Sequence, residues 1–143
     1  MPTCHVMQGP VGSGKTRCAS ALNVLTCSAD KYFVGVDGTY NFNPAHLGAA
    51  HRECMRTFLT GVYSGIDVCV DNTNITLEEL APYVRVAQAM GYIVHVHTFV
   101  CSPETSARRN THGVPLKACE RMCKNLRIPP AWWDVEHTVT NTD

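Results

Sequence analysis

A glycine-rich segment near the start of the chain has the residue types and spacing of a phosphate-binding loop. Residues 9–16 read GPVGSGKT, which matches the pattern G-x-x-x-x-G-K-[S/T] at every fixed position. In such a loop, backbone N–H groups surround a phosphate, the lysine reaches the β- and γ-oxygens of a nucleoside triphosphate, and the last hydroxyl binds Mg²⁺. We therefore predict ATP and Mg²⁺ as ligands, held by Gly9, Gly12, Ser13, Gly14, Lys15, Thr16 and Arg17.

Two aspartates follow predicted strands and add acidic groups to this loop. Asp30 ends an expected strand over residues 27–30, and Asp71 follows the apolar run 66–70. Because ligands of an open parallel sheet bind beyond the carboxyl ends of the strands, both carboxylates are expected near the phosphates. Asp71 has the position of a Walker B acid and is expected to bind Mg²⁺ together with Thr16. Asp30 can accept the proton of an attacking hydroxyl, or it can serve only as a helix or turn cap.

The elements that must position these residues alternate between strand and helix. Strands are predicted at residues 4–8, 27–30, 66–70 and 92–100, and helices at 15–25, 44–63, 76–90, 102–110 and 115–126. This alternation is typical of an α/β protein with a parallel sheet. We expect the three-layer P-loop NTPase fold, with four to five strands, helices on both faces and a short helical lid.

Capping residues and the last segment complete this prediction. Asn43 before Pro44 starts one helix, and Thr76 with Glu79 forms a capping box for the next. In the tail, residues 128–143, the two tryptophans at 132 and 133 are expected to pack on the core, and residues 135–140 are expected to form an edge strand.

Length and composition indicate one soluble globular domain. The 143 residues carry 12 basic and 12 acidic side chains, and no apolar run approaches the roughly 20 residues of a membrane-spanning helix. No secretory signal is recognisable, so an intracellular, cytoplasmic location is expected. The eight cysteines lack a C-x-x-C pair and are predicted to be reduced thiols rather than zinc ligands. The histidines at 95 and 97, which share one strand face, are predicted to be structural.

Basic residues gather in the last third of the chain. Residues 108–127 contain six lysines and arginines against one glutamate, whereas residues 30–79 are mainly acidic. This asymmetry suits a site with polyphosphate on one side and metal or a proton acceptor on the other, although two solvated faces would produce it as well.

Four aromatic residues lie between the second predicted strand and the next helix. Aromatic rings beside an acceptor cleft can stack on nucleobases, at about 1 to 3 kcal/mol per base. Tyr32 and Tyr40 are candidates for this role, whereas Phe33 and Phe42 are expected in the core.

The order and spacing of these segments resemble the polynucleotide-kinase-like, AAA-type P-loop proteins, including bacteriophage polynucleotide kinases. The resemblance runs from Gly9 to about Arg127 and rests on GPVGSGKT (9–16), SADKYF (28–33), DGTYNF (37–42), VDNTN (70–74) and RRNTHGVP (108–115).

The resemblance implies γ-phosphoryl transfer from ATP to a polynucleotide 5′-hydroxyl, with a lid at about residues 104–115. Lys15, Asp30 as general base, and Arg109 of the Arg-Asn pair are the implied catalytic residues. Arg109 is also expected on the nucleotide. The acceptor side is expected to hold Asp30, Tyr40, Asp71, Asn72 and Asn74.

Two residues depart from the phage pattern. Phe33 stands where phage enzymes have an arginine, which puts one contact to the acceptor phosphate in doubt, and Lys31 replaces the second acid after Asp30.

Three other functions stay open. The acceptor could be a hydroxymethyl group on a DNA base, such as 5-hydroxymethyluracil, which would enter the cleft as a flipped base. It could be a free nucleoside or sugar. The chain could instead be a nucleotide-gated binding module without catalysis, although Asp30 argues against this.

Overall fold

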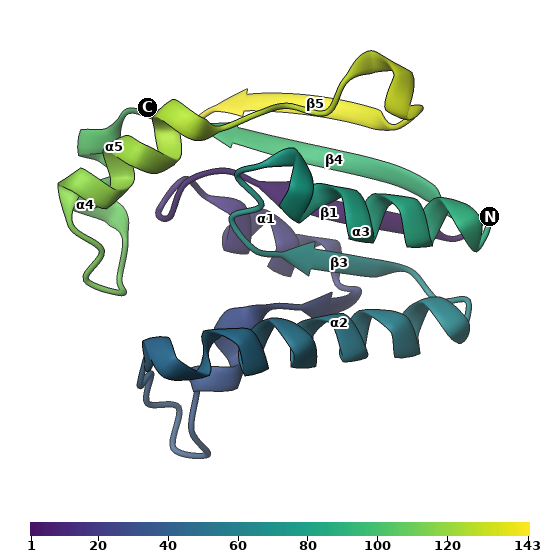
Figure 1. Cartoon of the computed structure of the whole chain (residues 1–143), viewed down its shortest axis with the longest axis horizontal. Coiled ribbons are helices and arrows are strands. Elements are labelled where there is room, and N and C mark those ends of the chain that lie inside the picture. Colours follow the sequence, from purple (N-terminus) through teal and green to yellow (C-terminus); the bar gives the residue numbers. More distant parts are fainter.

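A five-stranded parallel sheet forms the centre of the computed structural model, which describes residues 1–143 (Figure 1). All four strand pairings are parallel, and the spatial order is β2-β3-β1-β4-β5. The strands are β1 (Thr3–Gln8), β2 (Leu25–Cys27), β3 (Val68–Asp71), β4 (Ile93–Val100) and β5 (Glu136–Asn141). The predicted α/β fold with a parallel sheet is confirmed.

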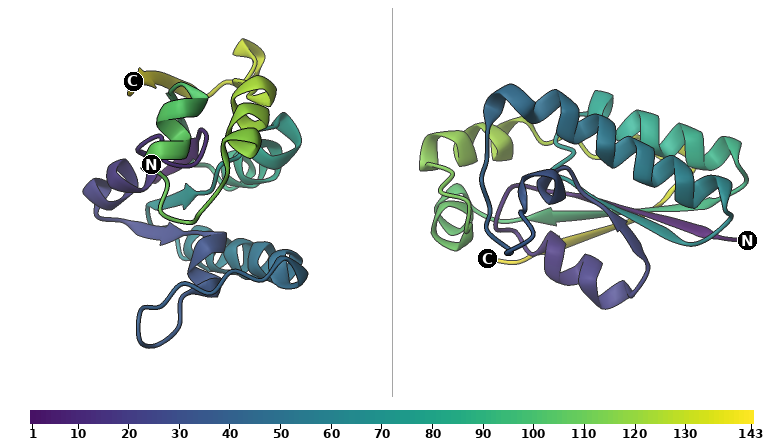
Figure 2. Two further views of the ribbon diagram at one scale, coloured as in Figure 1. Left: turned by 90° about the vertical axis from the view of Figure 1, so that its left-hand side faces the viewer. Right: turned by 90° about the horizontal axis from the view of Figure 1, so that it is seen from below.

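Helices cover both faces of the sheet and one of its ends. Figure 2 shows α1 on one face and the longer α2 and α3 on the other, while α4 and α5 lie beyond the carboxyl ends of the strands. The α-helices are α1 (Lys15–Leu22), α2 (Leu47–Tyr63), α3 (Leu77–Ala89), α4 (Pro103–Arg109) and α5 (Leu116–Asn125). Three short 3₁₀ helices are η1 (Ala29–Phe33), η2 (Pro44–His46) and η3 (Ala131–Trp133).

The two faces of the sheet are unequally covered. The main core lies under α2 and α3, where Phe58, Leu80 and Val84 are fully buried against the strands. The α1 face has a smaller core around Met7 and Phe99, because α1 is only 8 residues long. Part of the α1 face is therefore open to solvent.

The second strand and its flanks differ from the prediction. The first helix ends at Leu22 rather than at residue 25, because Asn23 takes the left-handed conformation (φ 54°) and Leu25 already pairs with β3. The strand that follows ends at Cys27, so Asp30 lies in η1 and not at a strand end. Ser28 caps η1 by accepting a hydrogen bond from the Asp30 N–H.

The predicted helix caps are confirmed. The Asn43 side chain accepts from the Ala45 N–H, although the first turn is 3₁₀ and α2 itself begins at Leu47. Thr76 and Glu79 form the reciprocal capping box of α3.

The tail is only partly as expected. Strand β5 pairs with β4 at the sheet edge, which confirms the predicted edge strand. Trp133 is buried, but Trp132 is 75% exposed, so the prediction that both rings pack on the core is wrong for Trp132. The two rings lie nearly perpendicular within η3, at 78°, and Arg85 stacks over both. None of the helices is both long and apolar enough to span a membrane.

Gly61 provides a test of how closely α2 packs on the sheet. A Cβ at Gly61 would lie 2.6 Å from Val68 Cγ1 and 2.7 Å from Leu25 Cδ2. We expect Gly61→Ala to destabilise the fold by about 1 to 3 kcal/mol, because the added methyl group overpacks this contact. The free energy of unfolding in urea measures the effect.

Gly48→Ala is the matched control in the same helix. There the nearest atom to an added Cβ is the flexible Arg52 Nη1 at 3.5 Å, so alanine is expected to stabilise by about 0.5 to 1 kcal/mol. Equal effects of the two substitutions would contradict the close packing at Gly61.

Candidate active site

The loop between β1 and α1 leaves several hydrogen-bond donors without a partner. No side chain caps the start of α1, and the N–H groups of Gly14, Lys15 and Thr16 donate to no backbone carbonyl. The Ser13 hydroxyl is buried and has no hydrogen-bond partner. A helix N-terminus with free donors attracts anions, so this loop fits the phosphate chain of a nucleotide.

Gly12 lies where the phosphate loop meets the lid. A Cβ at this position would come within 2.8 Å of the Ser106 carbonyl oxygen and the Asn110 nitrogen. The Ser106 hydroxyl donates to the Val11 carbonyl, which joins α4 to the loop. Only glycine allows this close approach between the two segments.

The Lys15 ammonium is buried at the base of the loop. Its side chain donates to the Pro10 carbonyl oxygen at 2.8 Å. Burial lowers the pKa of Lys15 to about 8, although the charges of Asp71 and Asp30 act in the opposite direction. A phosphate beside this ammonium would supply the missing counter-charge.

Thr16 and Asp71 form a second polar contact next to Lys15. The Thr16 hydroxyl donates to Asp71 Oδ2 at 2.9 Å, and the Asp71 side chain is buried. Burial raises the pKa of Asp71, while the Thr16 hydrogen bond and Lys15 oppose that shift. A hydroxyl and a carboxylate are the hard oxygen ligands that Mg²⁺ prefers, so the pair fits the predicted metal.

One cavity of about 640 Å³ joins these groups to the acceptor side. Most of the predicted site residues line it, namely Gly12, Gly14, Lys15, Thr16, Arg17, Asp30, Tyr40, Asp71, Asn72 and Arg109. Lid residues 109–112 form part of its wall. Segments far apart in the sequence therefore meet at one place.

Asp30 is held between two loops. Tyr40 Oη donates to Asp30 Oδ1 at 3.3 Å, and His112 Nδ1 lies 3.7 Å from Oδ2. The rings of Tyr40 and His112 stack at 4.0 Å with an interplanar angle of 9°. Burial, and then the Asp30 charge, raise the pKa of Tyr40 to about 12, so this hydroxyl remains a donor to the carboxylate at neutral pH.

His112 is a site residue that sequence reasoning missed. It lies in the predicted lid, but no spacing in the sequence connects it to Asp30, which is 82 positions earlier. Phe42 was placed wrongly in the core, because it is 51% exposed, whereas Phe33 is buried as expected.

The two predicted asparagines differ in position. Asn72 lines the cavity, and its Oδ1 accepts from the Ala29 N–H at 2.9 Å, which fixes the start of η1. Asn74 is buried with φ 46°, and its Nδ2 donates to the Met7 carbonyl. The expected acceptor contact of Asn74 is not supported, because this side chain is used up in holding the turn after β3 against β1.

Arg109 reaches toward the tail of the chain. Its Nη1 donates to the Thr142 carbonyl at 2.7 Å, and the Thr142 hydroxyl donates to the Ser13 carbonyl at 2.9 Å. A second cavity on this side of the loop is lined by Gly12, Ser13, Gly14, Arg17, Phe99, Arg109 and Thr142, among others. The contact of Thr142 with the phosphate loop could not be found from sequence spacing.

Comparisons with known proteins agree with this geometry. A family model described as "AAA domain" matches residues 4–113. The human NEDD4-binding protein 2 is 31% identical over 132 residues; the match covers 85% of this chain but only 7% of that protein.

Two solved structures share the fold. One is that of the Pnkp1/Rnl/Hen1 RNA repair complex (TM-score 0.71, 18% identity, 87% of this chain and 44% of that chain). The other is a putative kinase from Chloroflexus aurantiacus (TM-score 0.67, 18% identity, 98% and 88%). The family model covers more than half of the sequence, and the protein accordingly belongs to the AAA-domain family of P-loop phosphotransferases.

Proposed function

We propose that this chain transfers the γ-phosphoryl group of ATP to a hydroxyl group carried by a nucleic acid, in the manner of a 5′-hydroxyl polynucleotide kinase. The observation that carries the proposal is that Asp30 and the phosphate loop line the same cavity. A carboxylate opposite a phosphate loop supplies the proton acceptor that a kinase requires and a nucleotide-binding module does not.

At the nucleotide end, the free N–H groups of the loop bind the phosphate chain and the Lys15 ammonium lies against its β- and γ-oxygens. Thr16 and Asp71 hold Mg²⁺, which neutralises negative charge on the phosphates when it is bound. Arg109 lines both cavities and reaches the nucleotide from the lid.

At the acceptor end, the Asp30 carboxylate takes the proton of the attacking hydroxyl. Tyr40 and His112 hold the two carboxylate oxygens from opposite loops. Because His112 belongs to the lid, closure of the lid orients the base and excludes water in one movement.

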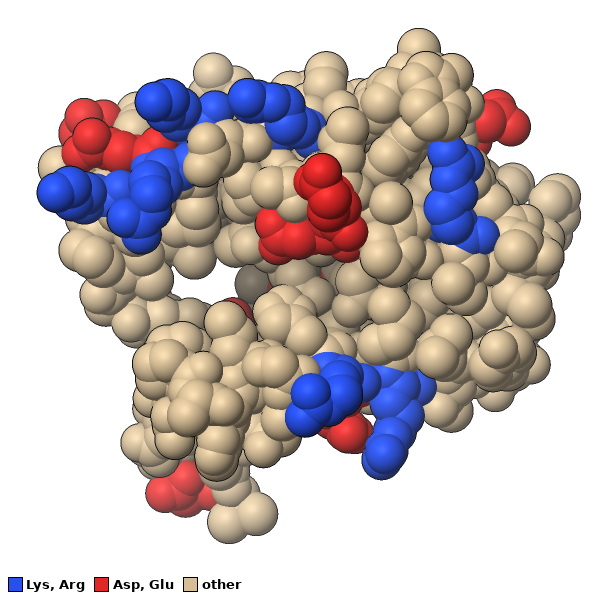
Figure 3. Space-filling model, viewed as in Figure 1, with Lys and Arg blue, Asp and Glu red and all other residues tan.

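Two features support a nucleic acid as the acceptor. The stacked rings of Tyr40 and His112 present flat aromatic surfaces at the cavity wall, which suit a nucleobase. Exposed basic side chains gather over α4 and α5, above the opening between the lid and the lower loop in Figure 3. They are Arg108, Lys117, Arg121, Lys124 and Arg127, and none of them forms a salt bridge. Unpaired positive charge beside the cavity suits a phosphate backbone.

A panel of acceptors tests the proposal. We expect label from γ-labelled ATP on 5′-hydroxyl DNA or RNA, rather than on DNA containing 5-hydroxymethyluracil or on free nucleosides and sugars. Lys117→Glu with Arg121→Glu is expected to raise the KM for the polynucleotide and to reduce its salt dependence by about one phosphate contact per residue. The KM for ATP should not change.

Each arm of the panel has a distinct meaning. Label on hydroxymethyluracil DNA or on small molecules alone would replace the proposed acceptor, and ATP binding without label on any acceptor would overturn kinase activity. Arg56→Glu on α2 is the control for the charge reversal, since Arg56 is exposed and already paired with Glu53 at 3.7 Å.

Asp30→Asn tests the general base. We expect kcat to fall by about 10² to 10⁴, because the amide cannot take up the proton, while the KM for ATP stays close to that of the wild type. Asp37→Asn is the matched control, because Asp37 is an exposed acid of the neighbouring loop that does not line the cavity. An equal loss of ATP affinity in Asp30→Asn would assign this residue to the nucleotide instead.

The lowered pKa of Lys15 predicts that nucleotide binding takes up protons. Near pH 8.5 part of the lysine is neutral in the nucleotide-free protein, since its pKa is about 8, and a bound phosphate favours the charged form. Calorimetric titration with Mg·ADP in buffers of different ionisation enthalpy should show uptake near pH 8.5 and much less near pH 7. Binding without proton uptake near pH 8.5 would contradict the buried, uncompensated ammonium.

A further inference from the structure

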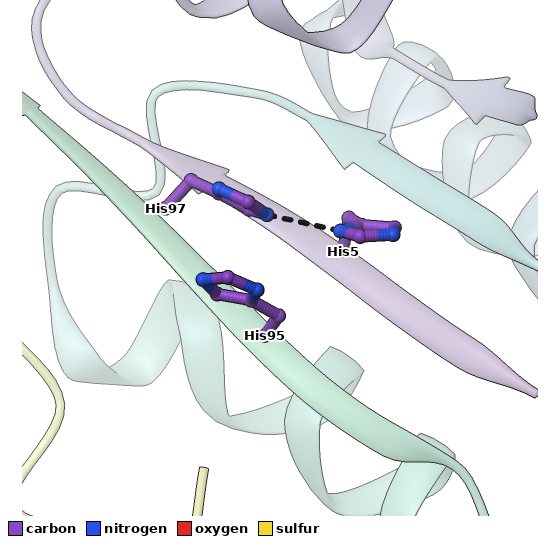
Figure 4. Close-up of side chains that lie close together, drawn as sticks. All are labelled: His5, His95 and His97. Carbon is purple, nitrogen blue, oxygen red and sulfur yellow. Dashed lines mark hydrogen bonds between the residues drawn. The ribbon is translucent and has the colours of Figure 1, made fainter. Parts of the chain in front are cut away.

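Three histidines gather on the open part of the sheet that the short α1 leaves uncovered. His5 lies on β1, and His95 and His97 lie on β4. His5 pairs in register with His95, and His97 is two residues further along, so all three side chains emerge on the same face. Figure 4 shows the three rings side by side across these two strands.

The ring nitrogens of this histidine cluster, His5, His95 and His97, converge. His5 Nδ1 and His97 Nε2 are 2.9 Å apart, and the rings of His95 and His97 are stacked at 3.8 Å. One nitrogen from each ring lies within 4.8 Å of the other two. Each ring is half-buried, so the cluster is reachable from solvent but partly shielded from it.

The surroundings keep the cluster uncharged. Burial, and then the neighbouring histidines, lower the pKa of His97 to about 4, and burial is also the main cause of the lowered pKa of His5. Neutral imidazole is the form that binds metal ions, because its free lone pair is not blocked by a proton.

His95 also has the outer partners that are typical of metal-binding histidines. Its Nε2 lies 2.7 Å from Thr138 Oγ1, and its Nδ1 lies 3.7 Å from Glu136 Oε2, both on β5. In metal sites, one ring nitrogen binds the ion while a hydroxyl, carbonyl or carboxylate orients the ring through the other nitrogen.

We propose that His5, His95 and His97 form a binding site for Zn²⁺, separate from the phosphate-binding cavity. Three imidazole nitrogens suit this ion, with distances of about 2.0 to 2.1 Å after small ring rotations, and water or the Glu136 carboxylate completes four ligands. Mg²⁺ prefers oxygen ligands, so the two metals would occupy different sites. Bound zinc would link β1 to β4 across their adjacent pair.

Zinc binding to the metal-free, reduced full chain tests the site. Titration with ZnCl₂ against a chromophoric chelator should give one bound ion per chain, unaffected by excess Mg²⁺. His5→Gln, His95→Gln and His97→Gln should each weaken binding by more than about tenfold, since each removes a ligand rather than an outer partner. His51→Gln, at an exposed position of α2, should leave zinc affinity unchanged.

A cobalt spectrum separates this site from the eight thiols of the chain. Co²⁺ bound to imidazoles gives ligand-field bands without the strong charge-transfer absorption of thiolate ligands. A thiolate band, tight zinc binding that survives all three substitutions together, or no stoichiometric zinc in the wild type would each overturn the proposal. Retained binding of Mg·ATP by the variants shows that they are folded, and it is independent of which acceptor the kinase uses.

Discussion

Uncompensated charge at the start of α1 governs the arrangement of the site. The loop brings together a buried ammonium, a buried carboxylate and several N–H groups that no protein group satisfies. Such groups are costly to bury without partners. The fold tolerates them because the sheet places Lys15 and Asp71 close enough to offset part of each other's cost, and a bound nucleotide and cation complete the pairing.

The lid and the tail depend on the same loop. Ser106 donates to it from α4, and Thr142 donates to it from the segment after β5. Asn110 then orders the bend that follows α4, because its side chain binds the carbonyls of Ser106, Ala107 and Val114 and accepts from the Val114 N–H. The phosphate loop is thus a shared anchor for two segments that close the cavity.

Local sequence patterns predicted the parts of the structure that local forces determine. The phosphate loop, the capping box of α3 and the buried strand before Asp71 all follow from neighbouring residues. The contacts of His112 with Asp30 and of Thr142 with Ser13 do not, because they join residues that are far apart in the sequence. Asn74 shows the opposite error: a polar residue near the site was predicted to face the acceptor, whereas its amide is needed to satisfy a backbone carbonyl.

The flat contact between Tyr40 and His112 has a consequence for how an acceptor enters. Its rings are parallel at 4.0 Å, close to the spacing of stacked bases, so a base that slides between them exchanges one stacking partner for two. Opening the pair costs little when the intruder is aromatic, and it costs the full stacking energy when the intruder is water. The same two rings hold the carboxylate, and the enzyme's resistance to wasteful hydrolysis of ATP is then set by how rarely they separate on their own.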